Sequence, residues 1–463
     1  MRRVWVLAAL AAISSCNGGT KPDPDRGALR QPSGLALSPD GRFLFVTGGN
    51  WDRLESGGTL ATLDVEAVHA ALRGSVTRAG GSLSASSPCR RVASSDDTIE
   101  CDPARFIDAD DTLLLGDGIG NIAIDQPTGD TGPYRLLIPQ RAPAALVWAD
   151  VTPGGDGVAV DCGQDEFGVC DEQHVVRRSA EDNSTLSSDP SRVFVDDQGF
   201  RFAYVPHLLG GDLTLIDLDG DQGPEITGRA EEFYREDVFD EFDASGGFAV
   251  AARACDPAQP SGPSRDCVRP QLYTTHRYWP GLKKFTVAAG LKVVVSGRDV
   301  RLAGIGTENV VARPIMGDLA FEDPEVGDSL LLVQTTPGSL ARVDTSIDPE
   351  AESEVDELRE TVALCSNPNV MAVHRPANEE WLALVSCLSD GRLAVVGLST
   401  FTVIASVPVG AGANELAVDP VREQVYVANS RENTISIVSL DRQSPDFLSE
   451  WARIGLGAGS REG

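Results

Sequence analysis

The chain has 463 residues, of which 41% are hydrophobic, and it carries a formal net charge of -30 at pH 7. Nucleic acids and anionic lipids attract proteins through their phosphates, so this charge argues against both as partners. The length would allow two domains, but nothing between the repeated segments described below looks like an independent unit. We therefore expect a single large domain.

The first 15 residues have the pattern of a secretory signal peptide. Two arginines precede an apolar run of about ten residues, too short to span a membrane permanently, and small residues follow. The sequence Ile13-Ser14-Ser15-Cys16 resembles a bacterial lipobox, which implies acylation of Cys16; the alternative is an ordinary signal peptide cleaved elsewhere. By the same resemblance, Asn17 implies transfer to the outer membrane, facing either the periplasm or the cell surface.

The acylated cysteine begins a segment, residues 16–30, that we expect to be a flexible tether because it is rich in Gly, Pro and charged residues. The main domain is expected over residues 31–457, and residues 458–463 are expected to be a disordered tail.

Four segments repeat one pattern of apolar runs and turns, beginning at Pro32, Pro190, Asn367 and Ala413. Each has three short apolar runs separated by a polar Asp/Pro/Gly turn and a Gly or Asn turn, which predicts three consecutive antiparallel strands. Asn369 and Asn414 hold equivalent positions about 45 residues apart, a period typical of four-stranded propeller blades. The runs LTLIDL, LAVVGL and ISIVSL are almost continuously apolar, as expected for sheets covered on both faces. We therefore expect an all-β fold, a single β-propeller.

The segments PSGLALSPDGRFLFVT and QVYVANSRENTISIV resemble the YVTN-type β-propeller repeat, whose signature is spelled out by Tyr426 to Asn429. This resemblance implies a fold more firmly than a function. Propellers of this family usually have seven blades, so we expect seven, with eight as the alternative. The eight candidate units begin near Gln31, Cys101, Ala144, Pro190, Ser245, Gly317, Asn367 and Ala413.

Eight cysteines follow Cys16, and they fall into local pairs. Disulfides are expected in an exported protein, and no Cys-x-x-Cys spacing favours the alternative of metal ligation. We expect four disulfides: Cys89 with Cys101, Cys162 with Cys170, Cys255 with Cys267, and Cys365 with Cys387.

A run of alternating carboxylates, formed by Asp217, Asp219, Asp221 and Glu225, resembles the calcium loops of some propellers. Alternate residues of a tight loop can turn their oxygens toward one hard cation. Gln222 stands where such a loop usually has glycine, and a plain Asp/Gly turn between outer strands would explain the same residues. Calcium is the one cofactor that the sequence suggests.

A stretch between Cys267 and Arg298 lacks acidic residues and mixes basic with aromatic ones. It could dock an acidic protein, a neighbouring subunit or a polysaccharide. The alternative is a pair of ordinary strands with packed rings and solvated charges. The candidate partner-binding residues are Arg269, Tyr273, His276, Arg277, Tyr278, Trp279, Lys283 and Lys284.

Catalytic motifs are lacking: there is no nucleophile elbow, phosphate loop or haem attachment motif, and histidine occurs only five times. No catalytic residue is predicted. We expect a lipid-anchored envelope protein that serves as a binding or scaffold module for a protein or glycan partner. Some propellers with similar repeats are lactonases or haem- or quinone-dependent oxidoreductases. The alternative is therefore an enzyme, a hydrolase or an oxidoreductase, with its site at the central channel.

Overall fold

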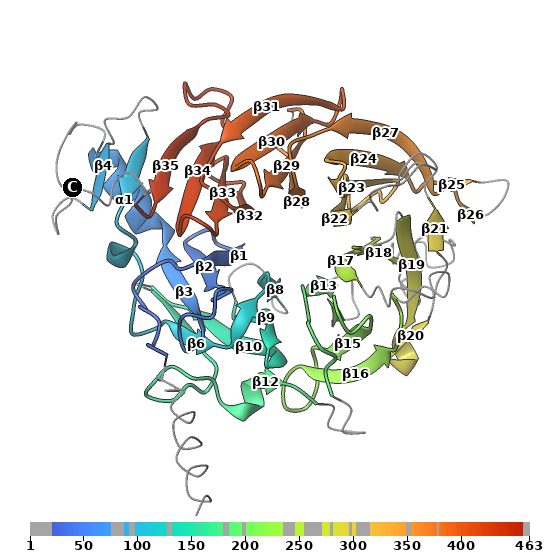
Figure 1. The fold of residues 1–463 in the computed structure, drawn as a ribbon, viewed down its shortest axis with the longest axis horizontal. Helices are drawn as coiled ribbons and strands as arrows, with labels where there is room; N and C mark the ends of the chain where they lie inside the picture. Colours follow the sequence, from blue (N-terminus) through green and yellow to red (C-terminus); the bar gives the residue numbers. More distant parts are fainter. Residues whose placement is uncertain are drawn as a thin grey trace, which may run out of the picture.

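The chain folds as a seven-bladed β-propeller, a ring of four-stranded sheets around a central axis (Figure 1). The computed structural model describes residues 21–75, 88–91, 98–126, 132–155, 157–178, 185–196, 201–234, 246–253, 271–277, 281–295, 299–301, 315–348, 353–376 and 379–456. No helix in these ranges is both long and apolar enough to cross a membrane.

The blades follow one another along the chain, and each begins with its innermost strand. Blade 1 contains β1 (Pro32–Leu37), β2 (Phe43–Gly48), β3 (Gly58–Asp64) and β6 (Leu113–Leu115). Blade 2 contains β7 (Asp117–Ile119) and β8 (Ala123–Asp125) on the inside, then β9 (Tyr134–Ala142), β10 (Ala144–Pro153), β11 (Val158–Asp161) and β12 (Val175–Val176). Blade 3 contains β13 (Phe194–Asp196), β14 (Phe202–Pro206), β15 (Leu213–Asp217) and β16 (Glu225–Ala230). Blade 4 contains β17 (Gly247–Ala252), β18 (Gln271–His276), β19 (Gly281–Ala288), β20 (Val293–Val295) and β21 (Asp299–Arg301).

The last three blades keep the same strand order. Blade 5 contains β22 (Ile315–Phe321), β23 (Ser329–Thr336), β24 (Ser339–Asp344) and β27 (Glu357–Ala363), with the small hairpin of β25 (Ile347–Asp348) and β26 (Ser353–Glu354) inserted. Blade 6 contains β28 (Pro368–His374), β29 (Leu382–Cys387), β30 (Arg392–Gly397) and β31 (Thr402–Pro408). Blade 7 contains β32 (Ala413–Asp419), β33 (Gln424–Asn429), β34 (Thr434–Ser439) and β35 (Glu450–Ile454). The described helices are α1 (Val65–Ser75) and the 3-10 turns η1 (Pro103–Arg105), η2 (Glu172–His174) and η3 (Ala289–Leu291).

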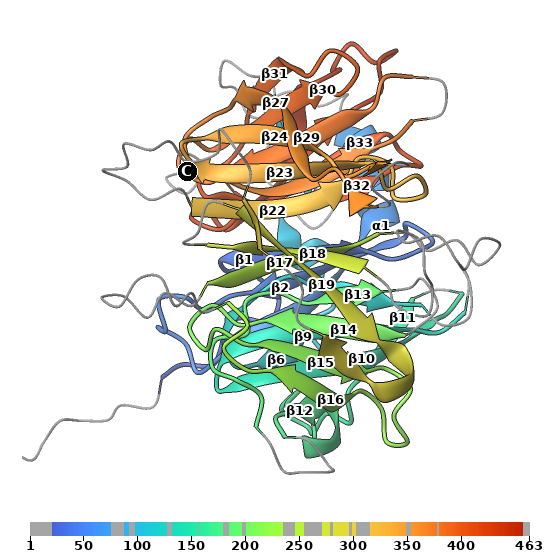
Figure 2. The same ribbon diagram turned by 90° about the vertical axis from the view of Figure 1, so that its right-hand side faces the viewer.

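Apolar residues between neighbouring blades form the core. The described residues contain seven apolar clusters, and each joins two adjacent blades, including blades 7 and 1. Strands β33 and β34 are buried along their whole length, as the continuous apolar runs predict. Figure 2 shows the blades stacked face to face, with β17 beside β22.

The number of blades is seven because one blade, blade 2 beginning at Asp117, replaces the two candidate units at Cys101 and Ala144. Cys101 ends β5 (Ile99–Cys101), a strand in an insertion between β3 and β6. Ala144 begins β10, a strand in the middle of blade 2.

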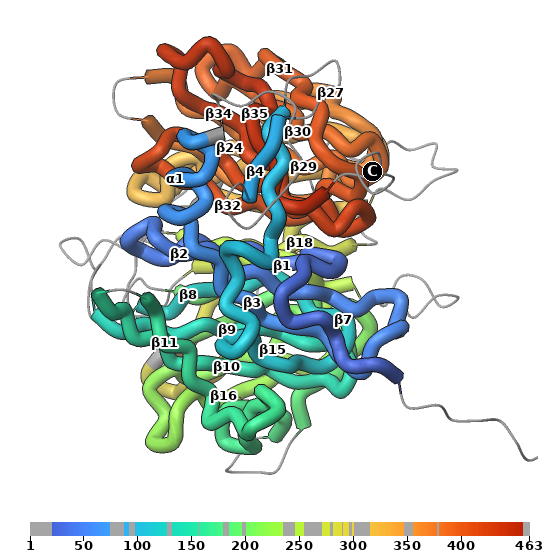
Figure 3. Tube along the Cα trace, turned by 90° about the vertical axis from the view of Figure 1, so that its left-hand side faces the viewer, coloured from blue at the N-terminus to red at the C-terminus, as the bar shows by residue number. Residues whose placement is uncertain are grey.

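The same insertion closes the ring. Strand β5 pairs in parallel with β35 and carries β4 (Cys89–Arg91) beside it, so a segment of blade 1 extends the outer edge of blade 7. Helix α1 buries Val65, Val68 and Leu72 in the apolar cluster shared by the two blades. Figure 3 shows α1 and β4 lying against blade 7. First and last blades are therefore joined by hydrogen bonds and by a common core.

Three of the four expected disulfides are present: Cys89–Cys101 within the β4–β5 hairpin, Cys162–Cys170 after β11, and Cys365–Cys387 between blades 5 and 6. Cys255 and Cys267 lie outside the described residues, as does Cys16.

The expected tether packs against blade 1 in its described part, residues 21–30. Leu29 is buried in the cluster between blades 7 and 1. The Ser56 hydroxyl donates to Asp23, and the Ser56 amide donates to the Pro22 carbonyl. A Gly/Pro-rich composition did not reveal that one leucine fixes this segment to the core.

Candidate ligand site in the axial channel

Polar side chains reach the axis from the first residues of the inner strands. In five blades the inner strand slips out of register with the second strand at this point, between Pro32/Gly34, Gly247/Val250, Met316/Leu319, Pro368/Met371 and Ala413/Glu415. Such bulges re-aim side chains away from the regular pleat. The residues inside the slips include Ser33, Phe248, Asp318, Asn369 and Asn414.

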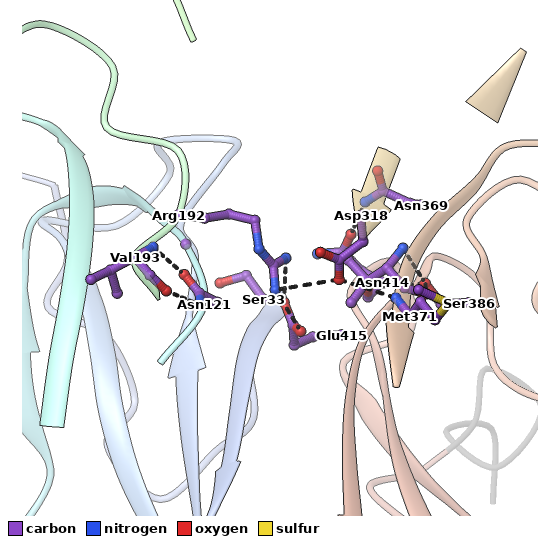
Figure 4. A network of polar contacts seen from close by, with 12 residues as sticks. Ser33, Asn121, Arg192, Val193, Asp318, Asn369, Met371, Ser386, Asn414 and Glu415 are labelled. Atoms are coloured by element: carbon purple, nitrogen blue, oxygen red, sulfur yellow. Dashed lines mark hydrogen bonds and ion pairs between the residues drawn. The ribbon is translucent and has the colours of Figure 1, made fainter. Parts of the chain in front are cut away.

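An ion pair crosses the axis between blades 3 and 7 (Figure 4). The Arg192 guanidinium donates two hydrogen bonds to the Glu415 carboxylate, at 3.0 and 3.2 Å. Asp318 of blade 5 lies 3.9 Å from the same guanidinium. Because the two Arg192 bonds are parallel and charge-assisted, they fix the orientation of both side chains.

Neighbouring polar contacts surround this ion pair. Asn121 forms two 2.9 Å hydrogen bonds with the Val193 backbone and so fixes the position of the residue after Arg192. On the other side, the Asn369 side-chain amide donates to the Asn414 side-chain oxygen at 3.0 Å. Figure 4 shows these contacts on either side of the Arg192–Glu415 pair.

Burial sets the electrostatics of the pair. It raises the pKa of Glu415, while the adjacent Arg192 guanidinium opposes this rise. Burial disfavours the charged form of Arg192 as well, but Glu415 and Asp318 outweigh it and raise the pKa of Arg192. The arginine is therefore the fixed positive charge at the centre of the ring.

Two cavities adjoin the pair, and Arg192 lines both. The first, which we call the arginine cavity, has a volume of about 430 Å³ and lies at the ring face formed by the β2–β3, β29–β30 and β33–β34 loops. Its lining includes Trp51, Arg141, Arg277, Leu388 and Arg431. The second cavity, of about 410 Å³, includes Phe194, Asp318, Phe321, Pro324 and Arg375 and lies toward the other ends of the inner strands.

Arg141 and Arg277, which both line the arginine cavity, are held by different contacts. Arg141 donates from its Nε and Nη2 atoms to the two carboxylate oxygens of Asp189. Its guanidinium lies 5.1 Å from the centre of the Trp51 ring. Arg277 lies 3.7 Å from the Phe248 ring and donates to the Met316 carbonyl, the Thr335 hydroxyl and the Asn369 side-chain oxygen.

Arg431 is exposed at the cavity mouth. Its guanidinium forms no ion pair with any described residue.

None of the five histidines lines either cavity. His69 contacts Gln424 at the outer rim, and His207 contacts Thr214 inside blade 3; burial lowers the pKa of each to about 4. His276 contacts the Tyr234 carbonyl, and His374 is buried on β28. His174 pairs with Asp171 and stacks on Trp148.

The four carboxylates of the expected calcium loop are not brought together. No three His, Cys, Asp or Glu side chains in the described ranges could hold a metal ion. Asp217 pairs with Lys292, and Asp219 pairs with Arg201 at 2.8 Å. Asp217 and Glu225 face each other as register partners at the β15–β16 turn, with Asp221 between them in the chain. Asp217 and Asp219 are therefore held by ion pairs to other elements, and calcium binding at this turn stays a prediction.

The described members of the basic and aromatic stretch do not form one exposed patch. Tyr273, His276 and Lys284 are buried in blade 4, and Lys284 pairs with Asp356 at 2.6 Å. Lys283 donates to the Phe233 carbonyl and pairs with Asp299 at 3.2 Å. Arg277 alone of the described members lines the axial channel. Arg269, Tyr278 and Trp279 lie outside the described residues.

The residues at the axis escaped the sequence analysis, although the repeats held a signal for them. Asn369 and Asn414 hold equivalent positions at the start of an inner strand, and Ser191 holds that position in blade 3. Arg192, Asp318 and Glu415 hold the next position. Extending the alignment of Asn369 with Asn414 to every blade would have listed them.

Comparison with known proteins supports the fold. No family model matches the chain, and no curated protein matches it in sequence. A solved structure of hydrazine synthase from Kuenenia stuttgartiensis is similar over 91% of this chain and 98% of that chain, with 13% identity and a TM-score of 0.51. The periplasmic gluconolactonase of Pseudomonas aeruginosa is similar over 82% of this chain and 86% of that chain, with 14% identity and a TM-score of 0.49. At these identities the likeness extends to the fold alone, a seven-bladed β-propeller.

Proposed function

We propose that the chain is a binding module of the bacterial cell envelope, anchored through Cys16, that receives its ligand in the arginine cavity. The observation that carries this proposal is the cavity itself. Side chains from blades 1, 2, 3, 4, 6 and 7 converge on it, and the Arg192–Glu415 pair lies at its base. Rigid inner strands thus hold the recognition groups in fixed positions, as binding sites require.

Recognition accounts for the lining better than catalysis does. The lining holds hydrogen-bond donors, two rings and two leucines, and its one carboxylate, Glu415, already accepts two hydrogen bonds from Arg192. A general base must be able to reach and remove a substrate proton. In this arrangement Glu415 orients Arg192 instead.

The envelope location is supported by the sequence. An apolar segment between two arginines and Cys16 fits an exported lipoprotein, and Asn17 fits the outer membrane. The cysteine pairs that form disulfides fit an oxidising compartment outside the cytoplasm.

Photo-cross-linking in intact cells tests the proposal. Benzoylphenylalanine replaces Leu388, which lines the arginine cavity, or Val421, which is 79% exposed in the β32–β33 turn on the opposite face. We expect an adduct from the Leu388 position alone, read by mass spectrometry of the purified protein. Adducts from Val421 alone, or from neither position, would overturn the proposal.

A further inference from the structure

The second cavity holds a carboxylate and an arginine that a ligand can reach. It has a volume of about 410 Å³ and is lined by the inner strands β13, β17 and β22 of blades 3, 4 and 5. Its charged lining residues are Asp318, Arg192 and Arg375. Because Arg192 is already bonded to Glu415, Asp318 and Arg375 are the two charged groups left for a ligand.

Asp318 supplies the negative charge, next to the Arg192–Glu415 pair. The Arg192 guanidinium directs both of its hydrogen bonds to Glu415 and lies 3.9 Å from Asp318 (Figure 4). Two carboxylates thus share one guanidinium, which leaves one negative charge in excess. Asp318 accepts hydrogen bonds from the Leu319 and Met371 amides, at 3.0 and 3.2 Å, and a carboxylate can accept about four. A ligand ammonium group can therefore bind Asp318 and supply the missing positive charge.

Arg375 supplies the positive charge, and it is exposed. Its guanidinium donates to the carbonyls of Phe321 and Glu322, both at 2.7 Å, which fix its position. It forms no ion pair with any described residue. The nearby carboxylates have other partners: Glu322 pairs with Arg342 at 2.9 Å, and Asp323 accepts from backbone amides of its own turn. A ligand carboxylate can therefore pair with the Arg375 guanidinium.

The spacing of the two charges favours a ligand longer than a free amino acid. Asp318 and Phe321, whose carbonyl holds Arg375, are three residues apart on β22, which corresponds to about 10 Å in an extended strand. The amino and carboxylate groups of a free amino acid are about 2.5 Å apart. With a hydrogen bond of about 2.9 Å at each end, it spans only about 8 Å. A peptide of two or three residues is long enough to reach both groups.

The walls of the second cavity also fit a peptide. Strands β13, β17 and β22 are each the end strand of a sheet, so their inner edges present backbone groups to which an extended peptide can bond. Several lining side chains are apolar and only partly buried, and a ligand side chain can pack against them: Phe194, Val195, Ala252, Ala320 and Pro324.

We infer that the second cavity binds a short peptide with both ends free, its ammonium directed to Asp318 and its carboxylate to Arg375. An apolar side chain of the peptide packs against the partly buried wall. This site is additional to the arginine cavity and does not depend on the function proposed for that cavity.

Isothermal titration calorimetry of the purified full-length protein tests the inference with leucyl-alanine, leucyl-alanyl-alanine and free leucine. We expect one site per chain for the dipeptide, for the tripeptide or for both, and the tighter of the two identifies the length. The N-acetylated form and the C-terminal amide of that peptide should each bind at least about tenfold more weakly, because each lacks one of the two charges. Free leucine should be weaker by a similar factor, because it cannot reach both groups.

Variants of Arg375 assign the carboxylate end. Arg375→Gln should weaken the free-ended peptide about tenfold and leave the affinity of its amide unchanged, while Arg375→Lys should keep part of the affinity because it keeps the charge. Arg105→Gln is the matched control, since Arg105 is about half exposed on η1 and does not line the cavity. The N-acetylated peptide tests the other end without disturbing Asp318, which lies at the axis. Thermal unfolding of each variant checks that the ring remains folded.

Four results would overturn the inference: no binding by either peptide, an acetylated or amidated peptide that binds as tightly as the free one, free leucine that binds as tightly as the peptides, or an unchanged affinity of Arg375→Gln. The photo-cross-linking at Leu388 reports on the arginine cavity, so failure of this inference and failure of the proposed function are distinguishable.

Discussion

Removing the Glu415 carboxylate should destabilise the whole ring, because it leaves Arg192 buried without its main partner. The Glu415 side chain is 6% exposed and the Arg192 side chain is 15% exposed. Breaking a buried ion pair from one side costs about 3–5 kcal/mol. Asp318, at 3.9 Å, still offers Arg192 a weaker partner, so we expect Glu415→Ala to cost about 3 kcal/mol.

Urea unfolding followed by tryptophan fluorescence measures this loss. The matched control is Glu379→Ala, which breaks the surface pair of Arg442 with Glu379, whose side chains are 36% and 37% exposed. We expect that control to cost less than about 1 kcal/mol. The double variant Arg192→Met/Glu415→Leu should lose less than Glu415→Ala, because Arg192 is removed together with its main partner, while Asp318 keeps the Leu319 and Met371 backbone amides as donors.

If Glu415→Ala lowered the free energy of unfolding by less than about 1 kcal/mol, the proposed stabilising role of the Arg192–Glu415 pair would be refuted. It would mean that water solvates Arg192 freely and that the pair does not hold blades 3 and 7 in place.

Three further outcomes follow from the same structure. Replacing Cys89 and Cys101 by serine should lower the free energy of unfolding by about 3 kcal/mol, because the β4–β5 hairpin that closes the ring loses its crosslink. Hydrogen exchange in β5 and β35 should become faster, and unchanged exchange in both strands would contradict this role. Burial lowers the pKa of His69 to about 4 from 6.5, so its stabilising contribution is complete above pH 6.5 and falls by about 3 kcal/mol as the pH drops to 4 and below. His69→Gln should therefore flatten the urea stability profile between pH 7 and 4, and an equally steep profile would count against it. Cys16→Ser should move the protein from the detergent phase to the aqueous phase in Triton X-114 partition, and retention in the detergent phase would argue against the lipid anchor.

The fold was largely predictable because each blade is a local unit. In blades 6 and 7, one continuous segment of the sequence specifies three strands and the two turns between them. An example is QVYVAN followed by TISIVS in blade 7. The error in the candidate units came from non-local pairing. Strand β5 belongs in sequence to blade 1 but pairs in parallel with β35, some 350 residues away, and no local pattern specifies that partner.

The site was harder to predict because its parts are distant in sequence. Arg192 and Glu415 are 223 residues apart and meet only when the ring closes. The surroundings of the basic stretch in blade 4 were hard to predict for a related reason. Tyr273 and Lys284 lie on strands covered on both faces, so their polar ends turn inward to Asp356 of the blade 5 insertion rather than to solvent. Composition alone cannot distinguish basic and aromatic residues buried between blades from the same residues exposed to solvent.

A crystal structure of the protein purified from its own cells with the captured ligand tests the central claim most directly. We predict ligand density in the arginine cavity, above the Arg192–Glu415 pair. Ligand density confined to the outer strands or to the opposite face of the ring, with the arginine cavity holding only water, would contradict it.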